Sequence, residues 1–345
     1  MVDELVKQQL KSARLRYVTT QEPGYTRQRH GKGFTYRDPE GQTVRDPALR
    51  AWFESIVIPP AWEDVWISPY TNGHILATGR DTRGRKQYRY HPDWQALRNE
   101  DKFSCLTSFG EHLPKIREVT DAHLRQRSLS REKVLAMVVR LLEKTLIRVG
   151  NREYAHHNNT YGLTTLMDDH VTVESGRIAF EFVGKSGKEH LIDVADRRLA
   201  RAVKSCRDIP GQRLFQYFDD AGERCAVESG DVNAYLQEIT GEHFTAKTFR
   251  TWGASSRLIC LLGDQPEAET PREAEQQVNE CVRQVAAELG NTVAVCRKYY
   301  LHPAIIEAHL ETPMQSLLAK QKLPASPYGL QPEEQVFMRL MQAEG

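Results

Sequence analysis

Five side chains between residues 148 and 300 are of the types that a protein needs to attack a phosphodiester without a metal ion. They are two guanidiniums, an amine, an amide and a phenol: Arg148, Arg250, Lys185, Asn291 and Tyr300. When a hydroxyl attacks a phosphodiester, negative charge grows on the non-bridging oxygens, and each donor preorganised toward those oxygens lowers the barrier by about 3–4 kcal/mol. The residue types therefore indicate metal-free phosphodiester cleavage.

Each member of this set suits a different part of the reaction. Arg148 and Arg250 could hold the phosphate as permanently charged, bidentate donors, and Asn291 could add a neutral N–H donor. A lysine amine changes its protonation when it is desolvated, so Lys185 could deliver a proton to a departing alkoxide. A phenol has an ordinary pKa of about 10, so a tyrosine is a poor nucleophile near pH 7 unless cations stabilise the phenolate. The two arginines could therefore serve the phosphate and the nucleophile together.

The set lies in four short blocks of sequence: Ile147–Gly150 (IRVG), Phe182–Lys185 (FVGK), Lys247–Gly253 (KTFRTWG) and Arg297–Pro303 (RKYYLHP). These blocks, in this order, resemble the catalytic blocks of poxvirus-type type IB DNA topoisomerases, a branch that also includes bacterial members. The resemblance covers most of the chain from Ser130 to Pro303, with a weaker match from Gly79 to Tyr90.

The resemblance implies a role for each of the five residues. Arg148 and Arg250 would clamp the scissile phosphate, Lys185 would protonate the leaving 5′-oxygen, and Tyr300 would carry a 3′-phosphotyrosyl bond. Asn291 departs from the viral pattern, which has histidine nine residues before the nucleophile. This substitution keeps a hydrogen-bond donor and removes a titratable charge, so the viral rate and pH profile should not be assumed here.

The resemblance also implies the whole reaction. Supercoiled duplex DNA would be relaxed by transient cleavage of one strand, rotation of the released 5′-hydroxyl end, and religation. Because the phosphotyrosine conserves the energy of the broken bond, neither ATP nor a divalent metal is required, and we expect no cofactor. The expected partner is duplex DNA, held by a monomeric clamp.

The elements that must position these residues can be read from periodicity. Apolar residues recur at helical spacing from Val134 to Leu146, and Arg148 ends this stripe. From Val171 to Val194 the period changes to two, which predicts a three-stranded meander. Lys185 would lie at the tip of its second hairpin. The Gly-Lys-Ser at this tip copies the end of a phosphate-binding loop, but Ala179 stands where the first glycine would have to be, so we exclude nucleotide binding.

The amino-terminal part has a different pattern. Short, turn-rich segments from Leu15 to Tyr90 predict strands, and His91-Pro92-Asp93 breaks the pattern. We therefore expect an α+β protein with a β-rich DNA-clamp domain over residues 1–92. A larger, mainly helical catalytic domain with the meander would span residues 93–345, in the catalytic fold of type IB topoisomerases and tyrosine recombinases.

Further DNA contacts are expected from a cluster of cations with interleaved polar and aromatic residues. These are Arg80, Arg83, Arg85, Lys86, Gln87, Tyr88, Arg89 and Tyr90. Clustered cations supply salt-sensitive phosphate affinity, while glutamine and tyrosine can reach base edges or sugars. A solvated edge strand is the alternative. Lys247 is a further candidate, because it precedes Arg250 by three residues on one helix face.

Charge alone argues against DNA binding, since the net charge is only +1. The distribution of charge along the chain weakens this argument. Residues 1–100 hold 16 Lys and Arg against 12 Asp and Glu, whereas residues 264–288 hold seven carboxylates and two arginines. We expect the acidic run to be a linker and a solvated helix face away from DNA.

The remaining features indicate a location in the cytoplasm, on the nucleoid. Met1 to Arg16 lacks the apolar core of a signal peptide, and no apolar run has the roughly 18 residues of a membrane span. The six cysteines form no C-x-x-C pair, which favours reduced thiols over a disulfide framework or zinc site. No other motif suggests a metal site.

Two alternatives remain open. A site-specific tyrosine recombinase would use the same five residues in a tetramer, although recombinases generally have histidine where this chain has Lys247. A non-catalytic DNA-binding clamp would use the cations only to grip phosphate.

Overall fold

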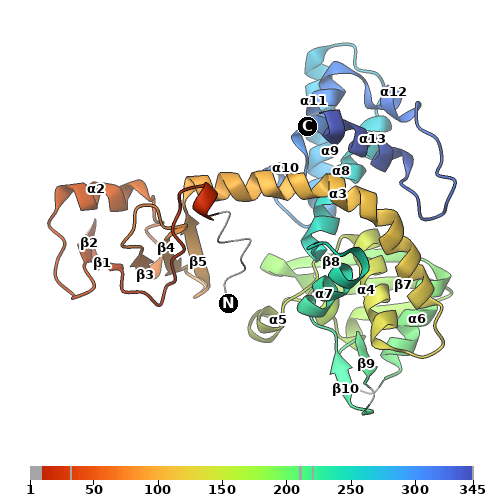
Figure 1. The fold of residues 1–345 in the computed structure, drawn as a ribbon, viewed down its shortest axis with the longest axis horizontal. Helices are drawn as coiled ribbons and strands as arrows, with labels where there is room; N and C mark the ends of the chain where they lie inside the picture. Colours follow the sequence, from red (N-terminus) through yellow and green to blue (C-terminus); the bar gives the residue numbers. More distant parts are fainter. Residues whose placement is uncertain (1–9, 32, 210–211, 220, 344–345) are drawn as a thin grey trace. The chain divides into compact units, whose positions relative to one another are not determined.

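The computed structural model describes residues 10–343 except 32, 210, 211 and 220. The chain divides into two compact units, Met1–Lys102 and Phe103–Gly345, here called unit 1 and unit 2 (Figure 1). The division falls inside helix α3 (Pro92–Leu124), whose first residue is the boundary predicted from the sequence. The expectation that no signal peptide is present rests partly on residues 1–9, which lie outside the described residues.

Unit 1 is built on a five-stranded antiparallel sheet, in agreement with the predicted β-rich fold. Its elements are β1 (Tyr25–His30), β2 (Gly33–Arg37), α2 (Pro47–Ser55), β3 (Glu63–Ile67), β4 (Ile75–Arg80) and β5 (Lys86–Tyr90), with strand order β2-β1-β3-β4-β5. Asp46 caps α2, and Pro47 occupies its first turn, where a missing N–H costs nothing. Phe53 of α2 is buried with Val65 and Ile67 of β3 in a core of unit 1's own.

Unit 2 is mainly helical. It takes in the carboxyl-terminal part of α3 and then α4 (Arg131–Thr145), α5 (Arg152–Asn158), α6 (Arg197–Arg207), α7 (Ser229–Thr240), α8 (Ala246–Gly263), α9 (Pro271–Glu288), α10 (Val293–Tyr299), α11 (Pro303–Glu311), α12 (Met314–Leu318) and α13 (Pro332–Ala343). Residues Val134–Val139 of α4 are all buried, as expected of a helix that neighbours surround on every side. Much of α8 is buried as well, so these two helices form the centre of the unit.

The predicted meander is present in unit 2. It consists of β6 (Val171–Glu174), β7 (Arg177–Gly184) and β8 (Lys188–Ala195), in the order β6-β7-β8. Along β7 buried and exposed residues alternate strictly, the pattern of a sheet with one face on the core. A second, two-stranded sheet pairs β9 (Gln216–Phe218) with β10 (Arg224–Ala226).

Three short 3-10 turns complete unit 2: η1 (Leu163–Thr165), η2 (Asp168–His170) and η3 (Lys185–Gly187). The last of these forms the β7–β8 turn. The acidic run from Asp264 to Glu288 forms a linker and α9. The inner face of α9 packs on the core through Val278, Val282 and Val285.

Candidate active site

Arg148 lies in the loop that follows α4. The helix stops at Leu146, whose left-handed backbone (φ 53°) turns the chain, so Arg148 is beyond the helix end and does not cap its last turn. The loop is held by backbone bonds, since the Leu163 N–H donates to the Arg148 carbonyl at 2.7 Å and the Thr164 N–H to the Val149 carbonyl at 2.6 Å. The turn η1 therefore fixes the backbone on which Arg148 stands.

Arg250 is placed on the second turn of α8. Thr245 and Thr248 cap this helix, the Thr245 N–H donating to Thr248 Oγ1 at 3.2 Å. Arg250 is only 4% exposed, and its Nη2 donates to the Leu289 carbonyl at 3.1 Å. The guanidinium therefore braces the end of α9, immediately before Asn291.

Asn291 binds Arg148 and lies two residues after Leu289, which Arg250 holds. Its backbone N–H donates to the Ala286 carbonyl at 2.9 Å, which ties the residue to the end of α9. Its side-chain Oδ1 accepts from Arg148 Nη2. The sequence separates these two residues by 143 positions, so the bond is a product of the tertiary fold.

Tyr300 ends α10, and its ring lies beside Arg250. The Arg250 Cζ atom is 5.2 Å from the centre of the Tyr300 ring. Ser255 of α8 holds the backbone on both sides of the tyrosine, because its hydroxyl donates to the Tyr300 carbonyl and accepts from the His302 N–H, both at 3.2 Å. One helix therefore carries both Arg250 and the anchor of the tyrosine segment.

Lys185 is at the exposed tip of the β7–β8 hairpin, as predicted. Ser186 (φ 68°) and Gly187 (φ 74°) form the left-handed turn beside it. The Lys185 side chain has no hydrogen bond or ion pair to any residue that the structure describes. The stem of the hairpin does reach the other site residues, since Lys188 Nζ donates to the Asn291 carbonyl at 3.4 Å.

The site presents positive charge and unused donors. Among the described residues, Arg250 Nε and Asn291 Nδ2 are buried donors without a hydrogen-bond partner. Burial, with a smaller contribution from the charge of Arg148, lowers the pKa of Arg250 to about 10, although Tyr300 opposes this shift. Arg250 therefore remains protonated at pH 7. Buried donors without partners are costly, and N–H donors beside cationic side chains are chemically suited to an anion.

The eight predicted DNA-contact residues of unit 1 lie around the β4–β5 hairpin, and some of them are engaged by unit 1 itself. Arg85 forms an ion pair with Asp81 at 2.6 Å and lowers the pKa of that carboxyl to about 2. Gln87 Nε2 donates to the same carboxylate at 3.0 Å. Arg89 Nη2 donates to the Val57 carbonyl at 2.7 Å.

The other residues of this hairpin are more exposed, although Arg80 pairs with Asp64 at 3.4 Å and Lys86 Nζ donates to Thr20 Oγ1 at 3.0 Å. Lys86, Tyr88 and Tyr90 alternate along β5 and are exposed, whereas Gln87 and Arg89 between them are half-buried. The rings of Tyr88 and Tyr90 stack, with 5.7 Å between their centres and 10° between their planes. Arg80 and Arg83 are exposed near the turn. The predicted contacts therefore fall on two faces of the strand, and their role in binding stays a prediction.

Lys247 is exposed on the first turn of α8. Two other residues beside the site were not among the predicted residues. Ser255 gives no signal, because a buried serine in an apolar helix looks like an ordinary core residue. His190 could have been found, since the period of two places it directly opposite Phe182 on the Lys185 hairpin.

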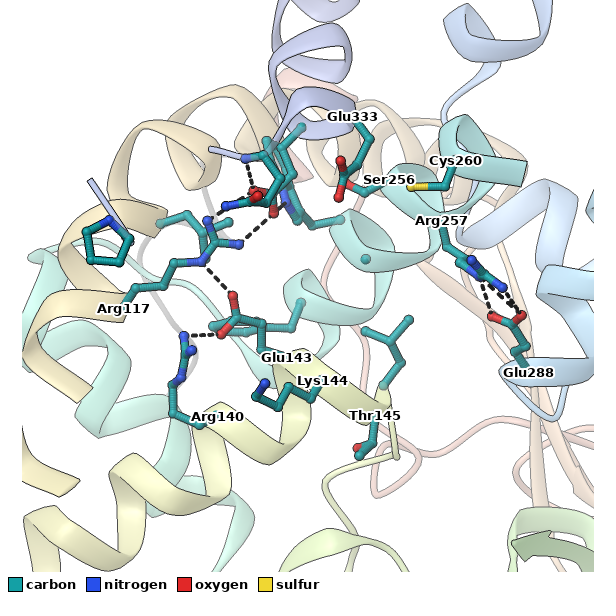
Figure 2. A pocket seen from close by; sticks show the side chains of 18 residues that line it. Arg117, Arg140, Glu143, Lys144, Thr145, Ser256, Arg257, Cys260, Glu288 and Glu333 are labelled. Atoms are coloured by element: carbon teal, nitrogen blue, oxygen red, sulfur yellow. Dashed lines mark hydrogen bonds and ion pairs between the residues drawn. The ribbon is translucent and has the colours of Figure 1, made fainter. Parts of the chain in front are cut away.

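A pocket of about 530 Å³ lies elsewhere in unit 2, and none of the five residues lines it (Figure 2). The side chain of Arg117 in α3 lines this pocket. It forms ion pairs with Glu143 of α4 at 2.6 Å and with Glu334 of α13 at 2.7 Å. Burial alone would lower the pKa of Arg117, but these two carboxylates raise it above its ordinary value. Trp252 of α8 also donates to Glu334, at 3.0 Å. Paired charges therefore join α3, α4 and α13 at the pocket wall, and the Trp252 hydrogen bond links them to α8.

Comparison with known proteins identifies the family. The family described as "Eukaryotic DNA topoisomerase I, catalytic core" matches residues 91–322, more than half of the chain, and "Bacterial DNA topoisomerase IB, N-terminal domain" matches residues 33–81. The DNA topoisomerase 1B of Acanthamoeba polyphaga mimivirus is 30% identical over 300 residues, covering 84% of this chain and 88% of the viral protein. The chain belongs to the type IB DNA topoisomerase family. It is therefore an enzyme, an isomerase, and the predicted family is confirmed.

More distant relatives agree with this assignment. The DNA topoisomerase I of Monkeypox virus is 22% identical over 248 residues, covering 71% of this chain and 75% of the relative. The DNA topoisomerase 1B of Vaccinia virus (strain Copenhagen) gives the same values. The matched catalytic core contains all five candidate residues of this type IB topoisomerase, whereas the match to the amino-terminal domain ends at residue 81, within the β4–β5 hairpin region.

Membrane-spanning helices and clustered metal ligands are both absent from the described part of this topoisomerase. None of the helices there has the length and apolar character that a membrane crossing requires. Within the same residues, no group of three or more His, Cys, Asp and Glu side chains is arranged to hold a metal ion.

Proposed function

We propose that this type IB topoisomerase relaxes supercoiled duplex DNA through a covalent bond between Tyr300 and the 3′ end of a cleaved strand. The observation that carries the proposal is the arrangement around the tyrosine. Arg250 lies 5.2 Å from the Tyr300 ring, and Arg148 is joined to Asn291. The buried Nε of Arg250 and Nδ2 of Asn291 lack partners among the described residues, as expected of donors reserved for a phosphate.

The cleavage step has a simple balance of atoms. Tyr300 Oη loses its proton to solvent and forms a bond to phosphorus, while the bond from phosphorus to the 5′-oxygen breaks. Lys185 gives a proton to that oxygen and regains one from solvent. Arg148, Arg250 and Asn291 donate to the non-bridging oxygens as their negative charge grows. Religation is the reverse of this step.

The proposed assembly is a single chain around one duplex. All five catalytic candidates come from one chain and lie in unit 2, so no second copy is needed to complete the site. Residues 1–92 would grip the DNA as a clamp domain, and residues 93–345 would perform the chemistry. The proposed location is the cytoplasm, on nucleoid DNA, and the match to a bacterial amino-terminal domain supports it.

The test is relaxation of negatively supercoiled plasmid in EDTA without ATP. Wild type should relax the plasmid, and Tyr300→Phe should not, because it lacks the nucleophilic oxygen. Tyr299→Phe is the matched control and should remain active. Denaturation during the reaction should trap a 3′-linked adduct with wild type and Tyr299→Phe, and not with Tyr300→Phe. An active Tyr300→Phe would exclude this tyrosine as the nucleophile, and tetramers that produce four-way junctions at a defined site would favour the recombinase alternative.

A further inference from the structure

His190 of β8 fills a narrow space between the Lys185 hairpin and the segment that carries Asn291. Its ring stacks on Phe182 of β7, with 5.0 Å between ring centres and 13° between the planes. The same His190 ring also lies very close to two glycines. A methyl group placed on Gly184 would lie 2.6 Å from both Cδ2 and Nε2 of His190, and one on Gly290 would lie 2.8 Å from Cε1. Neither position therefore leaves room for a side chain.

These contacts lie beside two site residues. Gly184 directly precedes Lys185, and Gly290 directly precedes Asn291. Lys188 adds a second link across the same junction through its 3.4 Å hydrogen bond to the Asn291 carbonyl. Since the Lys185 side chain makes no bond to any described residue, the stem of the hairpin is what joins Lys185 to the rest of the site.

We infer that His190 is a positioning residue: it docks the Lys185 hairpin against Gly290 and so sets the proton donor in line with the leaving oxygen. This inference rests on the proposed role of Lys185 as the general acid. His190 acts through Lys185 and need not touch the DNA. The docked geometry requires a neutral imidazole, because the charged groups that face it among the described residues are all cations. They are Arg148 from the loop after α4, Arg250 from α8 and Lys188 from its own strand.

The pH dependence follows from this surrounding charge. Burial lowers the pKa of His190 from its ordinary value, and the three cations lower it further. The undocked hairpin would have an ordinary imidazole with a pKa near 6.5. The undocked state therefore takes up a proton more readily, and docking weakens as the pH falls through that value. Above it the imidazole is neutral in both states, and docking is at full strength.

The first experiment compares two leaving groups in single-turnover cleavage by the full-length enzyme. One DNA substrate has the ordinary 5′-oxygen at the scissile bond, and the other has a bridging sulfur. A thiol is far more acidic than an alcohol, with a pKa of about 8.5 in cysteine, so the sulfur leaves without a general acid. We expect His190→Ala to slow cleavage of the ordinary DNA by about 10–100-fold, a partial loss of the roughly 10²–10⁴-fold that a general acid contributes. With the sulfur substrate its rate should lie within about threefold of wild type, since the acid is not needed.

Lys185→Ala separates this inference from the proposed function. If the sulfur substrate does not restore Lys185→Ala, then Lys185 is not the general acid and the proposed function fails at that residue. If it restores Lys185→Ala but not His190→Ala, then His190 has a general structural role and the inference is wrong.

A second experiment tests the docking contact itself. Gly184 has an ordinary backbone conformation, so Gly184→Ala adds only a methyl group that collides with His190. We expect this variant to show the same selective loss on ordinary DNA. The combination with His190→Ala should be no slower than His190→Ala alone, because the methyl group then has room. Fully additive losses would contradict a direct contact.

The pH prediction uses the ratio of the two rates, which cancels effects common to both substrates. In wild type the ratio of sulfur to oxygen cleavage should rise as the pH falls below about 6.5. His190→Gln, which is neutral throughout, should give a constant ratio. A wild-type ratio that does not change with pH would overturn the requirement for a neutral imidazole.

Discussion

The Asn291 amide accepts a hydrogen bond from Arg148 at one end, and the proposed cleavage step uses the donor at its other end. Oδ1 accepts from Arg148, while the buried Nδ2 has no partner among the described residues. Asn291→Ala should lower the single-turnover cleavage rate by roughly 100-fold, the effect of losing one preorganised donor, with little change in DNA affinity. Asn291→Asp is the informative companion, because it keeps the acceptor for Arg148 and lacks the donor. A fully active Asn291→Asp would show that Nδ2 has no part in cleavage.

Histidine at the same position would introduce a titratable group between two arginines. An imidazole changes charge near pH 6.5, and an amide does not. Asn291→His should therefore alter the cleavage rate and make it depend on pH through this range. Rates measured from pH 5 to pH 8 check this. An unchanged rate and profile would refute the view that asparagine in place of the viral histidine matters.

Ser255 is expected to matter for rate because it holds the backbone of Tyr300. Its hydroxyl bonds to the Tyr300 carbonyl and the His302 N–H, both at 3.2 Å. Ser255→Ala should slow cleavage at saturating DNA by roughly 10-fold through misplacement of the nucleophile, without weakening DNA binding. It should also lower the free energy of unfolding by about 1–3 kcal/mol, because two buried backbone groups lose their partner.

Ser256→Ala is the matched control on the same helix. The Ser256 hydroxyl is also buried and has no hydrogen-bond partner among the described residues. Its removal should therefore leave the cleavage rate unchanged and stability equal or slightly higher. Equal losses in both variants would mean that the effect of Ser255 is packing and not the hydroxyl bridge.

The sequence predicted residues whose side chains could take part in phosphodiester chemistry. It did not predict residues whose role depends on tertiary contacts. The four blocks led to the prediction of Arg148 and Tyr300, and the structure places Arg148 on Asn291 and Tyr300 beside Arg250; their catalytic roles stay a prediction. Nothing in the sequence indicates that Ser255 bridges Tyr300, or that His190 meets Gly290. Such contacts join segments far apart in the chain, and a serine or histidine in a regular element carries no local sign of them.

At the level of elements, the meander was predicted correctly and helix α3 was not. The strands of residues 171–194 have a period of two and are separated by turn residues, both local signals. In α3 the apolar residues do not gather on one face, and Pro114 lies inside it, so the helical pattern is weak. Pro92 was taken as a break in the pattern, but it is the first residue of α3, where proline is well tolerated.

Helix α13 is expected to stabilise unit 2 through Glu334. This carboxylate is 5% exposed and accepts from Arg117 Nη2 at 2.7 Å and from Trp252 Nε1 at 3.0 Å. Glu334→Ala should reduce the free energy of unfolding by about 3 kcal/mol, because Arg117 then keeps only Glu143 as a carboxylate partner and Trp252 Nε1 loses its acceptor. Urea denaturation followed by circular dichroism measures this.

The neighbouring Glu333 provides the control for that prediction. It lines the same pocket, but it makes no ion pair with any described residue (Figure 2). Glu333→Ala should change stability by no more than about 0.5 kcal/mol, as is usual for a surface substitution. If Glu333→Ala and Glu334→Ala destabilise equally, the loss comes from helix α13 in general and not from the buried ion pairs.

On the scale of the whole molecule, a net charge of +1 is compatible with DNA binding because the charge is unevenly distributed. Residues 1–100 carry a surplus of four cations, 16 against 12, and the five catalytic candidates lie in the rest of the chain. Each unit also has its own hydrophobic core, one around Phe53 and Ile67 and the other around α4 and α8. Affinity and chemistry should therefore be separable.

A fragment of residues 92–345, which keeps α3 whole, tests this separation. It retains the larger core and all five catalytic candidates, so it should fold cooperatively and form the Tyr300 adduct at saturating DNA. Its affinity should be weaker, and the dependence of log K on log salt concentration should be shallower, by about 0.9 for each phosphate that residues 1–91 neutralise in the full chain. Fluorescence anisotropy with a duplex at several salt concentrations measures both quantities. If the fragment binds as tightly as the full chain with the same salt slope, residues 1–91 do not grip the phosphate backbone, and the exposed face of Lys86, Tyr88 and Tyr90 has some other use.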